Sequence, residues 1–277
     1  MIRIFSILAG LAFSFVLALS FVFEAIGTAK EGLPNTVESN FVEHPHALKL
    51  ASDGLFGKFD KQQLQRGFAV YQGVCQNCHA LKFVAFRDLK ALGYDDDEVK
   101  AIAKQYQVPA YNAATGEVKT QPGKPTDHFP PVVYGGKGAP PDLSLITKSR
   151  HGGAAYVHSL LLGYKDQQGY KNEKGLELLK AFPDAKTPDG LFFNPYFANL
   201  NIAMPPPLTA DGQVTYAPGN PPATKEQMAQ DVAAFLVWTA EPNLAERHEK
   251  GWPVVLFLLL ATVLAYMAKR NVWADKH

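Results

Sequence analysis

Apolar residues form one long run near each end of this chain, and the sequence between the two runs is mixed. Residues 4–23 are almost wholly apolar and follow the basic residue Arg3. That arrangement is typical of a secretory signal or an N-terminal anchor, and Ala25, Gly27 and Ala29 are small residues that suit a signal peptidase. Because the run exceeds the ~7–15 apolar residues of an ordinary signal, cleavage and retention as an anchor both stay open.

The second apolar run covers residues 252–268. As a helix it would be about 25 Å long, enough to cross a bilayer core when the flanking residues snorkel. Trp252 and Trp273 are of the kind found at membrane interfaces. A buried globular helix is the alternative, but the run is apolar on every face and is followed at once by Lys269 and Arg270. We therefore expect a transmembrane helix.

Basic residues beside the two runs predict the orientation of the chain. Lys269, Arg270 and Lys276 place the C-terminus in the cytoplasm by the positive-inside rule, and Arg3 places the N-terminus there before any cleavage. The sequence thus predicts three parts: a signal peptide or N-terminal anchor over 1–29, an exported domain over 30–250, and a membrane anchor with a cytoplasmic tail over 251–277.

Within the exported part, apolar residues recur at helical spacing in three places: 60–79, 94–108 and 224–242. No alternating pattern predicts a strand, so residues 109–145 and 163–224 are expected to be long loops, in keeping with 20 prolines and 22 glycines. The fold should be mainly α, with irregular, proline-rich loops. A net charge of +1 favours neither nucleic acid nor an anionic membrane surface as a partner.

The clearest helix is the one predicted over 224–242. Thr224 and Gln227 match a capping box, and Pro242 follows the end. Phe235 and Trp238 are expected to pack on the helix that begins near residue 60. In the helix over 94–108, the acidic run Asp95–Glu98 suits the positive end of a helix dipole, and a docking patch is the alternative.

The only two cysteines, Cys75 and Cys78, stand directly before His79 in the pattern C-x-x-C-H. A zinc site would need a second ligand pair, which the chain lacks, and a disulfide across two residues would constrain the unfolded chain little. A dithiol redox pair needs no following histidine. The pattern therefore favours covalent attachment of a c-type haem, with His79 as an iron ligand.

A haem of this kind also needs a sixth ligand or an open site, and Met204 is the preferred candidate. Met1 is the initiator, Met267 lies in the apolar run, and Met228 fits the core face of a helix. Met204 stands before three prolines in a stiff loop, although a gap-filling methionine is the alternative. The rival ligands are His44, His46, His128, His151, His158 and His248.

Five stretches identify a family when they are taken together and in order. The chain resembles the cytochrome c1 family, the haem subunits of bacterial and mitochondrial cytochrome bc1 complexes, over most of residues 55–275. The stretches are RGFAVYQGVCQNCHALKF, APPDLSLITKSRHGGAAYVHSLLLGY, FFNPYFANLNIAMPPPL, AQDVAAFLVWTAEP and YMAKRNVW.

The resemblance implies roles for individual residues. Cys75 and Cys78 would carry one covalently attached haem c, with His79 and Met204 as iron ligands. Arg150 would pair with a haem propionate and Tyr156 would lie near it, while Pro140 and Pro141 would pack beside the haem. Two departures from the family stand out: Lys137 occupies a position where many relatives have an asparagine-bearing loop, and the second cysteine pair of some bacterial relatives is absent.

The resemblance also implies a function: a single-electron relay with no substrate-transforming site of its own. The donor would be the Rieske iron–sulfur protein, the acceptor a cytochrome c, and cytochrome b a partner, in a dimeric complex. The chain would lie in a bacterial inner membrane with the haem domain in the periplasm. The alternatives are an anchored cytochrome c of another complex, a five-coordinate haem sensor or peroxidase, and a dithiol oxidoreductase.

Overall fold

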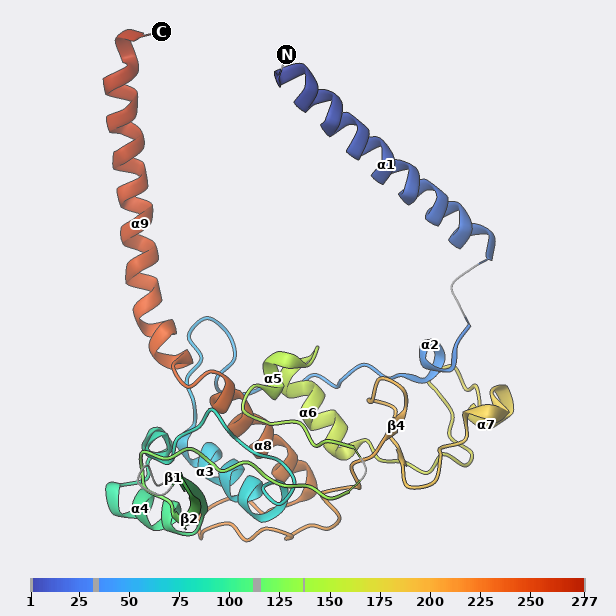
Figure 1. The fold of residues 1–277 in the computed structure, drawn as a ribbon, viewed down its shortest axis with the longest axis vertical. Coiled ribbons are helices and arrows are strands. Elements are labelled where there is room, and N and C mark those ends of the chain that lie inside the picture. Colours follow the sequence, from blue (N-terminus) through green and yellow to red (C-terminus); the bar gives the residue numbers. More distant parts are fainter. Residues whose placement is uncertain (1, 32–34, 112–115, 137, 277) are drawn as a thin grey trace. The chain divides into compact units, whose positions relative to one another are not determined.

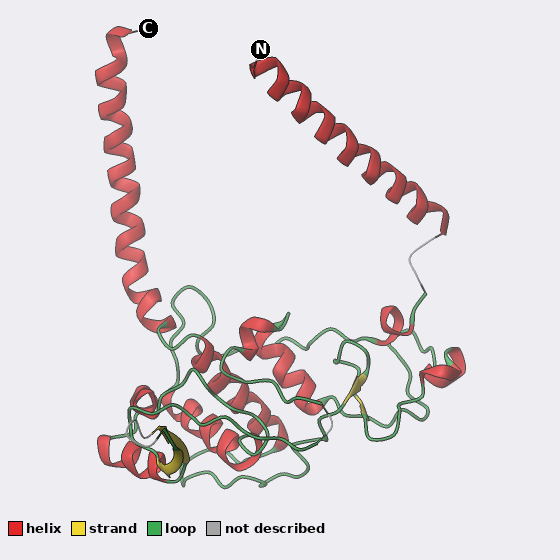
Figure 2. Cartoon of the chain, viewed as in Figure 1, coloured by secondary structure: helices red, strands yellow, loops and turns green. Residues whose placement is uncertain are grey.

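The computed structural model describes residues 2–31, 35–111, 116–136 and 138–276, and these fall into two compact units (Figure 1). One unit comprises residues 1–42 and 167–186, and the other comprises residues 43–166 and 187–277. Helices and loops dominate both (Figure 2). The mainly α fold predicted from the sequence is confirmed.

The smaller unit contains helices α1 (Ile2–Glu31), α2 (Val37–Phe41) and α7 (Leu178–Ala181) and the 3₁₀ turn η3 (Pro183–Ala185). Phe41 is its buried centre and packs its ring against Tyr170 and Phe182. Helix α1 is long and apolar enough to cross a membrane, and an N-terminal signal would have the same properties. Whether it is cleaved therefore stays a prediction.

The larger unit carries the remaining elements. Its helices are α3 (Lys61–Val70), η1 (Tyr71–Cys75), η2 (Phe86–Leu92), α4 (Asp96–Lys104), α5 (Ile146–Ser149), α6 (Gly153–Leu162), α8 (Lys225–Ala240), α9 (Leu244–Trp273) and η4 (Ala274–Lys276). Two antiparallel pairs of strands complete it: β1 (Gln107–Tyr111) with β2 (Val118–Pro122), and β3 (Phe192–Phe193) with β4 (Asn201–Ile202).

Helices α3 and α8 cross at close range, and Gly67 makes the crossing possible. A Cβ atom at Gly67 would lie 2.1 Å from the carbonyl oxygen of Asp231 and 2.6 Å from the Cβ of Phe235, so only glycine fits between the two backbones. At the residue after Gly67, the rings of Phe68 and Phe235 lie 5.6 Å apart between centroids. The predicted packing of Phe235 on the helix that begins near residue 60, here α3, is confirmed.

The predicted start of α8 is confirmed in part. The Thr224 hydroxyl accepts a hydrogen bond from the Gln227 backbone at 3.1 Å. The reciprocal half of a capping box is absent, because the Thr224 backbone N–H donates to the Pro222 carbonyl and the Gln227 side chain donates to Asp231. The prediction that Met228 is a core residue is confirmed by its complete burial.

The acidic run Asp95–Glu98 forms the start of α4. Asp95 caps the helix by accepting from two backbone N–H groups, while Glu98 accepts from the Asp95 backbone in a full capping box. The other two carboxylates pair with neighbouring lysines, Asp96 with Lys90 and Asp97 with Lys100. The helix-start interpretation of this run is therefore confirmed.

Several elements lie where the sequence predicted none, among them η2, α5, α6, α7 and the four strands. The predicted helix over 94–108 ends earlier, at Lys104, and its last residues, Gln107 and Val108, belong to strand β1. The rest of the β1–β2 hairpin falls in the expected loop over 109–145, and only Val108 of its ten strand residues is buried, so no alternating pattern marks it. The two-residue strands β3 and β4 are too short to leave a pattern. Helix α6 was also missed, because ten mostly apolar residues show no polar face.

Helix α9 contains the second apolar run and is long and apolar enough to cross a membrane. None of its residues is buried against the rest of the chain. Pro253 lies inside α9, close to the start of the apolar segment. The expectation of a membrane-spanning helix here agrees with the length and composition of α9, and the boundary at residue 250 stays a prediction.

Candidate functional site

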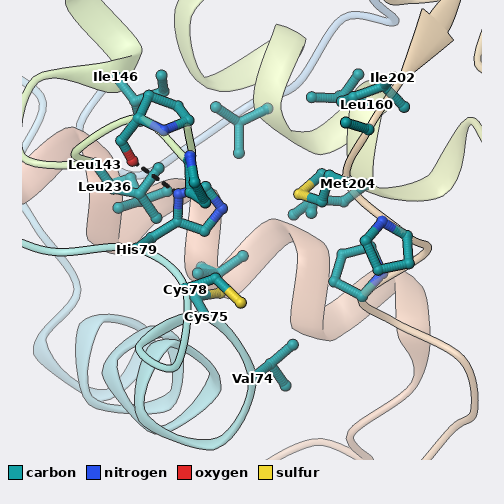
Figure 3. Close-up of a pocket in the computed structure, with 18 of the residues that line it drawn as sticks. Val74, Cys75, Cys78, His79, Leu143, Ile146, Leu160, Ile202, Met204 and Leu236 are labelled. Carbon is teal, nitrogen blue, oxygen red and sulfur yellow. Dashed lines mark hydrogen bonds between the residues drawn. The ribbon is translucent and has the colours of Figure 1, made fainter. Parts of the chain in front are cut away.

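A cavity of about 600 Å³ opens between the end of η1, helices α6 and α8, and two loops near residues 138–143 and 202–207 (Figure 3). Apolar side chains make up most of its wall, among them Leu143, Leu160 and Leu236. All eight site residues predicted from the sequence line this one cavity: Cys75, Cys78, His79, Pro140, Pro141, Arg150, Tyr156 and Met204.

The two cysteines reach the cavity because the helix changes its geometry just before them. Helix α3 continues into a π-helical turn, η1, that ends at Cys75. The backbone N–H groups of Cys78 and His79 then donate to the Cys75 carbonyl at 3.1 and 2.9 Å, which folds the motif into a compact turn. Both thiols are free, and burial together with the nearby Cys78 raises the pKa of Cys75 to about 12. Because neither cysteine forms a disulfide, both thiols are available for a covalent link to a bound group.

The imidazole of His79 has one nitrogen engaged and one available. Its Nδ1 lies 2.7 Å from the carbonyl oxygen of Pro141, and since a carbonyl only accepts, Nδ1 carries the proton. Nε2 then keeps a lone pair for a metal ion. Burial lowers the pKa of His79, opposed by the Pro141 hydrogen bond and the charge of Asp142, and so favours the neutral form that can act as a ligand.

The segment that follows Pro140 and Pro141 is hydrogen-bonded to the segment that follows the cysteine motif. Leu143 donates its backbone N–H to the Ala80 carbonyl at 2.9 Å. The Asp142 carboxylate accepts from the backbone of Lys82 at 2.9 Å, and the buried Ser144 hydroxyl accepts from the backbone of Phe83 at 3.1 Å. This fastening holds the Pro141 carbonyl where it fixes the His79 ring.

Met204 lies across the cavity from His79 (Figure 3). It follows strand β4 and precedes the prolines that stiffen the loop. The phenol of Tyr164 donates a hydrogen bond to the Met204 carbonyl at 3.0 Å. Burial, aided by the nearby Tyr156, raises the pKa of Tyr164, so this phenol keeps its proton and stays a donor.

The turn before Met204 is held by Asn194, which is fully buried. Its side-chain amide donates to the Leu160 carbonyl at 2.8 Å, and its side-chain oxygen accepts from the Tyr196 backbone. The turn ends at Leu200, whose φ of 65° is unusual for a residue other than glycine. Burial of the Leu200 side chain offsets the cost of that conformation.

No rival ligand lines the cavity: among the residues the structure describes there, His79 is the one histidine and Met204 the one methionine. The Nε2 of His46 shares a hydrogen bond with the Tyr196 phenol, the Nε2 of His158 lies 3.0 Å from a Glu226 carboxylate oxygen, and His248 donates to the Gly57 carbonyl. No group of three or more His, Cys, Asp and Glu residues in the described parts of the chain could hold a bare metal ion.

Comparison with known proteins identifies the family. The model of the cytochrome C1 family matches residues 50–276 of this chain. The chain belongs to the cytochrome c1 family. It is 44% identical over 242 residues to the cytochrome c1 of Rhodospirillum rubrum, covering 81% of this chain and 86% of the relative. It is 39% identical over 238 residues to the mitochondrial cytochrome c1-2 of Solanum tuberosum, covering 83% of each.

One relative is a longer protein. The chain is 39% identical over 251 residues to the cytochrome b/c1 of Bradyrhizobium diazoefficiens, which spans 85% of this chain and 36% of that protein. A cytochrome c1 is the haem-carrying, membrane-anchored electron-transfer subunit of a bc1 complex, in which it works together with cytochrome b.

The cavity of this cytochrome c1 fits the covalently bound c-type haem of its family. An apolar wall suits a porphyrin. Among the other lining groups are the ones that a c-type haem uses: two thiols, an imidazole and a thioether. Arg150, on the cavity wall, offers a guanidinium suited to a propionate. Arg150 also opposes the rise in the pKa of Tyr156 that burial causes. Lys137 lies outside the described residues.

The sequence did not single out Tyr164, Asn194 or Asp142 as site residues. Each acts on the cavity indirectly, through hydrogen bonds to backbone groups. Tyr164 and Asn194 stand at conspicuous places, at the end of α6 and the start of the N-P-Y-F stretch, but nothing in a sequence tells which carbonyl a phenol or amide will reach.

Proposed function

We propose that this chain passes single electrons from a Rieske iron–sulfur protein to a cytochrome c, through a haem held by Cys75, Cys78, His79 and Met204. One arrangement carries the proposal: a single apolar cavity with two free thiols, an imidazole on one side and a thioether opposite. A bound haem supplies the one-electron carrier. The chain's residues would hold the haem, shield it from water and supply two iron ligands, His79 and Met204.

Each residue has a defined task in this proposal. Cys75 and Cys78 would form the thioether links, and His79 would bind iron through Nε2 because its Nδ1 donates to Pro141. Met204 would bind from the other side, which raises the reduction potential and leaves no vacant site for a small molecule. Arg150 and Tyr156 would face a propionate, while Pro140 and Pro141 would pack beside the ring.

The surroundings favour an electron relay over a haem enzyme or sensor. Those functions need an open iron position, whereas here the turn before Met204 is held by Asn194 and the Met204 carbonyl is held by Tyr164. The membrane helix α9 and the basic residues after it support an exported haem domain in the periplasm of a bacterium, with the C-terminus in the cytoplasm. Assembly into a dimeric complex belongs to the same proposal.

The decisive test replaces Met204 by leucine and uses Met228→Leu as the matched control. Met228 is fully buried but does not line the cavity. We expect Met204→Leu to keep its haem through denaturation, lose the methionine–iron absorption band, bind carbon monoxide when reduced and have a lower reduction potential. Met228→Leu should change none of these. An unchanged spectrum and potential in Met204→Leu would assign the sixth ligand to another residue.

The attachment and the partners need separate tests. A Cys75→Ala and Cys78→Ala double variant should lose covalent haem in a denaturing haem-stain gel. In membranes, quinol-driven reduction of added cytochrome c should stop with this variant, and removal of the Rieske protein should stop it in the wild type. Haem reduction by quinol that persists without the Rieske protein would contradict the proposed donor.

A further inference from the structure

A short loop after Leu50 carries two large apolar side chains that the protein does not cover. Leu55 is 66% exposed and Phe56 is 73% exposed. The next aromatic residue, Phe59, turns inward and packs on the core. An exposed leucine alone needs no explanation, but two adjacent large residues at the tip of an ordered loop point to a surface that covers them.

The loop is built to hold those side chains outward. Its base is closed by a backbone hydrogen bond from Lys58 to Ala51 at 3.0 Å. The Asp53 carboxylate accepts from the Leu50 backbone at 2.8 Å. At Gly57 an added Cβ would lie 2.2 Å from the Ser52 carbonyl oxygen, so the turn demands glycine. These contacts therefore hold the loop in one conformation, with Leu55 and Phe56 exposed at its tip.

Two contacts join this loop to the start of the membrane helix α9 (Figure 1). The rings of Phe56 and Trp252 stack with centroids 5.5 Å apart and planes 23° from parallel. Four residues earlier on α9, the Nδ1 of His248 donates to the Gly57 carbonyl at 3.1 Å. The loop tip and the first residue of the apolar run thus form one continuous surface.

We propose that Leu55 and Phe56 insert into the interfacial zone of the bilayer that α9 spans. Tryptophan at the end of a membrane helix lies at the headgroup level, and Phe56 is stacked on the tryptophan in that position. The exposed Lys58 at the loop base suits the phosphate layer. The loop and α9 give the haem domain two contacts with the membrane, which limits its rotation about the anchor.

Lipid is favoured over a partner subunit as the occupant because the surface continues an apolar helix that is exposed on all sides in this chain. The inference rests on α9 spanning the bilayer, as proposed above. It concerns the orientation of the domain and adds nothing to the haem ligands, so it can fail while the electron-relay function stands.

The test measures the depth of a nitroxide label at the loop tip. The haem-loaded full-length chain uses both native cysteines in its thioether links, so an introduced cysteine is the one reactive thiol. Leu55→Cys is labelled and placed in vesicles of phosphatidylcholine and phosphatidylglycerol. Val133→Cys, 97% exposed and remote from α9 in sequence, is the aqueous control, and Val255→Cys in the apolar run is the membrane control. Collisions with oxygen and with a water-soluble nickel chelate report the depth.

We expect the label at residue 55 to collide several-fold less with the nickel chelate than the label at 133, and more with oxygen, as the label at 255 does. A label at 55 that behaves like 133 while 255 is in the membrane overturns the loop proposal alone. If 255 is also aqueous, the anchor assignment fails and the loop proposal with it. Protection at 55 in the assembled complex but not in vesicles would assign the surface to a partner subunit and overturn the lipid contact.

Discussion

Replacement of Asp231 by asparagine tests how the haem domain is held together. Asp231 lies on α8 with its side chain fully buried, and it pairs with Arg66 on α3, whose side chain is 11% exposed. Arg66 donates through two nitrogens, at 2.8 and 3.0 Å, and Gln227 donates a third bond at 2.9 Å. Asparagine keeps the volume and removes the charge, so the variant isolates the ion pair.

The expected loss follows from leaving the guanidinium buried without its counter-ion. Removing one partner of a buried, hydrogen-bonded pair costs about 3–5 kcal/mol. Arg66 keeps one hydrogen bond to Asn220 at 3.0 Å, so the low end of that range applies. For a domain of this size each kcal/mol lowers the melting temperature by roughly 2–4 °C, so Asp231→Asn should melt about 6–12 °C below the wild type.

The assay is thermal unfolding of the haem-loaded full-length chain in detergent, followed by circular dichroism. Lys100→Met is the matched control, because it breaks the exposed pair of Lys100 with Asp97 and should barely change the melting temperature. An Arg66→Met, Asp231→Leu double variant should recover much of the loss, since no charge is then buried. If Asp231→Asn melts with the control, the pair is hydrated in solution and the reasoning is wrong.

Four further predictions concern the site and the anchor. Gly67→Ala should force α3 and α8 apart and destabilise the domain by about 1–3 kcal/mol in the same assay. Tyr164→Phe should remove the hydrogen bond to Met204 and shift the methionine–iron band and the reduction potential with little change in haem content. Burial raises the pKa of Tyr71 and of Tyr164. Their contribution to stability is therefore full below pH ~10, the usual tyrosine pKa, and is lost as the pH rises further. The melting temperature, measured as the pH is raised, should fall above that pH. A domain that spans residues 30–249 should be soluble, keep a native visible spectrum and fail to assemble with its partners, because tethering supplies its effective concentration.

The sequence predicted which residues bind the cofactor better than it predicted the elements that form the cavity wall. The C-x-x-C-H pattern places Cys75, Cys78 and His79 together by covalent spacing alone, so no knowledge of the fold is needed. Met204 is 125 residues farther along the chain than His79. Only elimination among the few methionines and the family resemblance could select it, and the structure brings it to the same cavity.

The helices and the strands differed in how far the sequence revealed them. Helix α8 was found because a capping threonine, helical spacing and a final proline all agree. Helix α6 was not found, because it is apolar on most sides and contributes residues such as Tyr156 and Leu160 to the cavity. Amphipathic spacing identifies a helix that has one polar, solvent-exposed face. It cannot identify a helix that is apolar on all sides.

The contacts that hold the two ligand loops in place could not be predicted, and they explain how this cytochrome c1 keeps a shaped cavity without a disulfide. Both cysteines are free for the haem, so neither can tie a loop. Buried polar side chains bind backbone groups instead: Asp142 and Ser144 fasten the loop behind His79, and Tyr164 and Asn194 fasten the loop of Met204.

Each such hydrogen bond contributes only about 0.5–1.5 kcal/mol of net stability. Leaving its buried partner unsatisfied costs about 1–3 kcal/mol, so each bond selects one loop position more strongly than it stabilises the fold. Together with the restricted φ angles of Pro205 and Pro207, this selection is what sets the Met204 sulfur opposite His79. A variant that loses one of these bonds should therefore change the spectrum of the haem-loaded chain, which reports the proposed Met204 ligand, before it lowers the melting temperature of the domain.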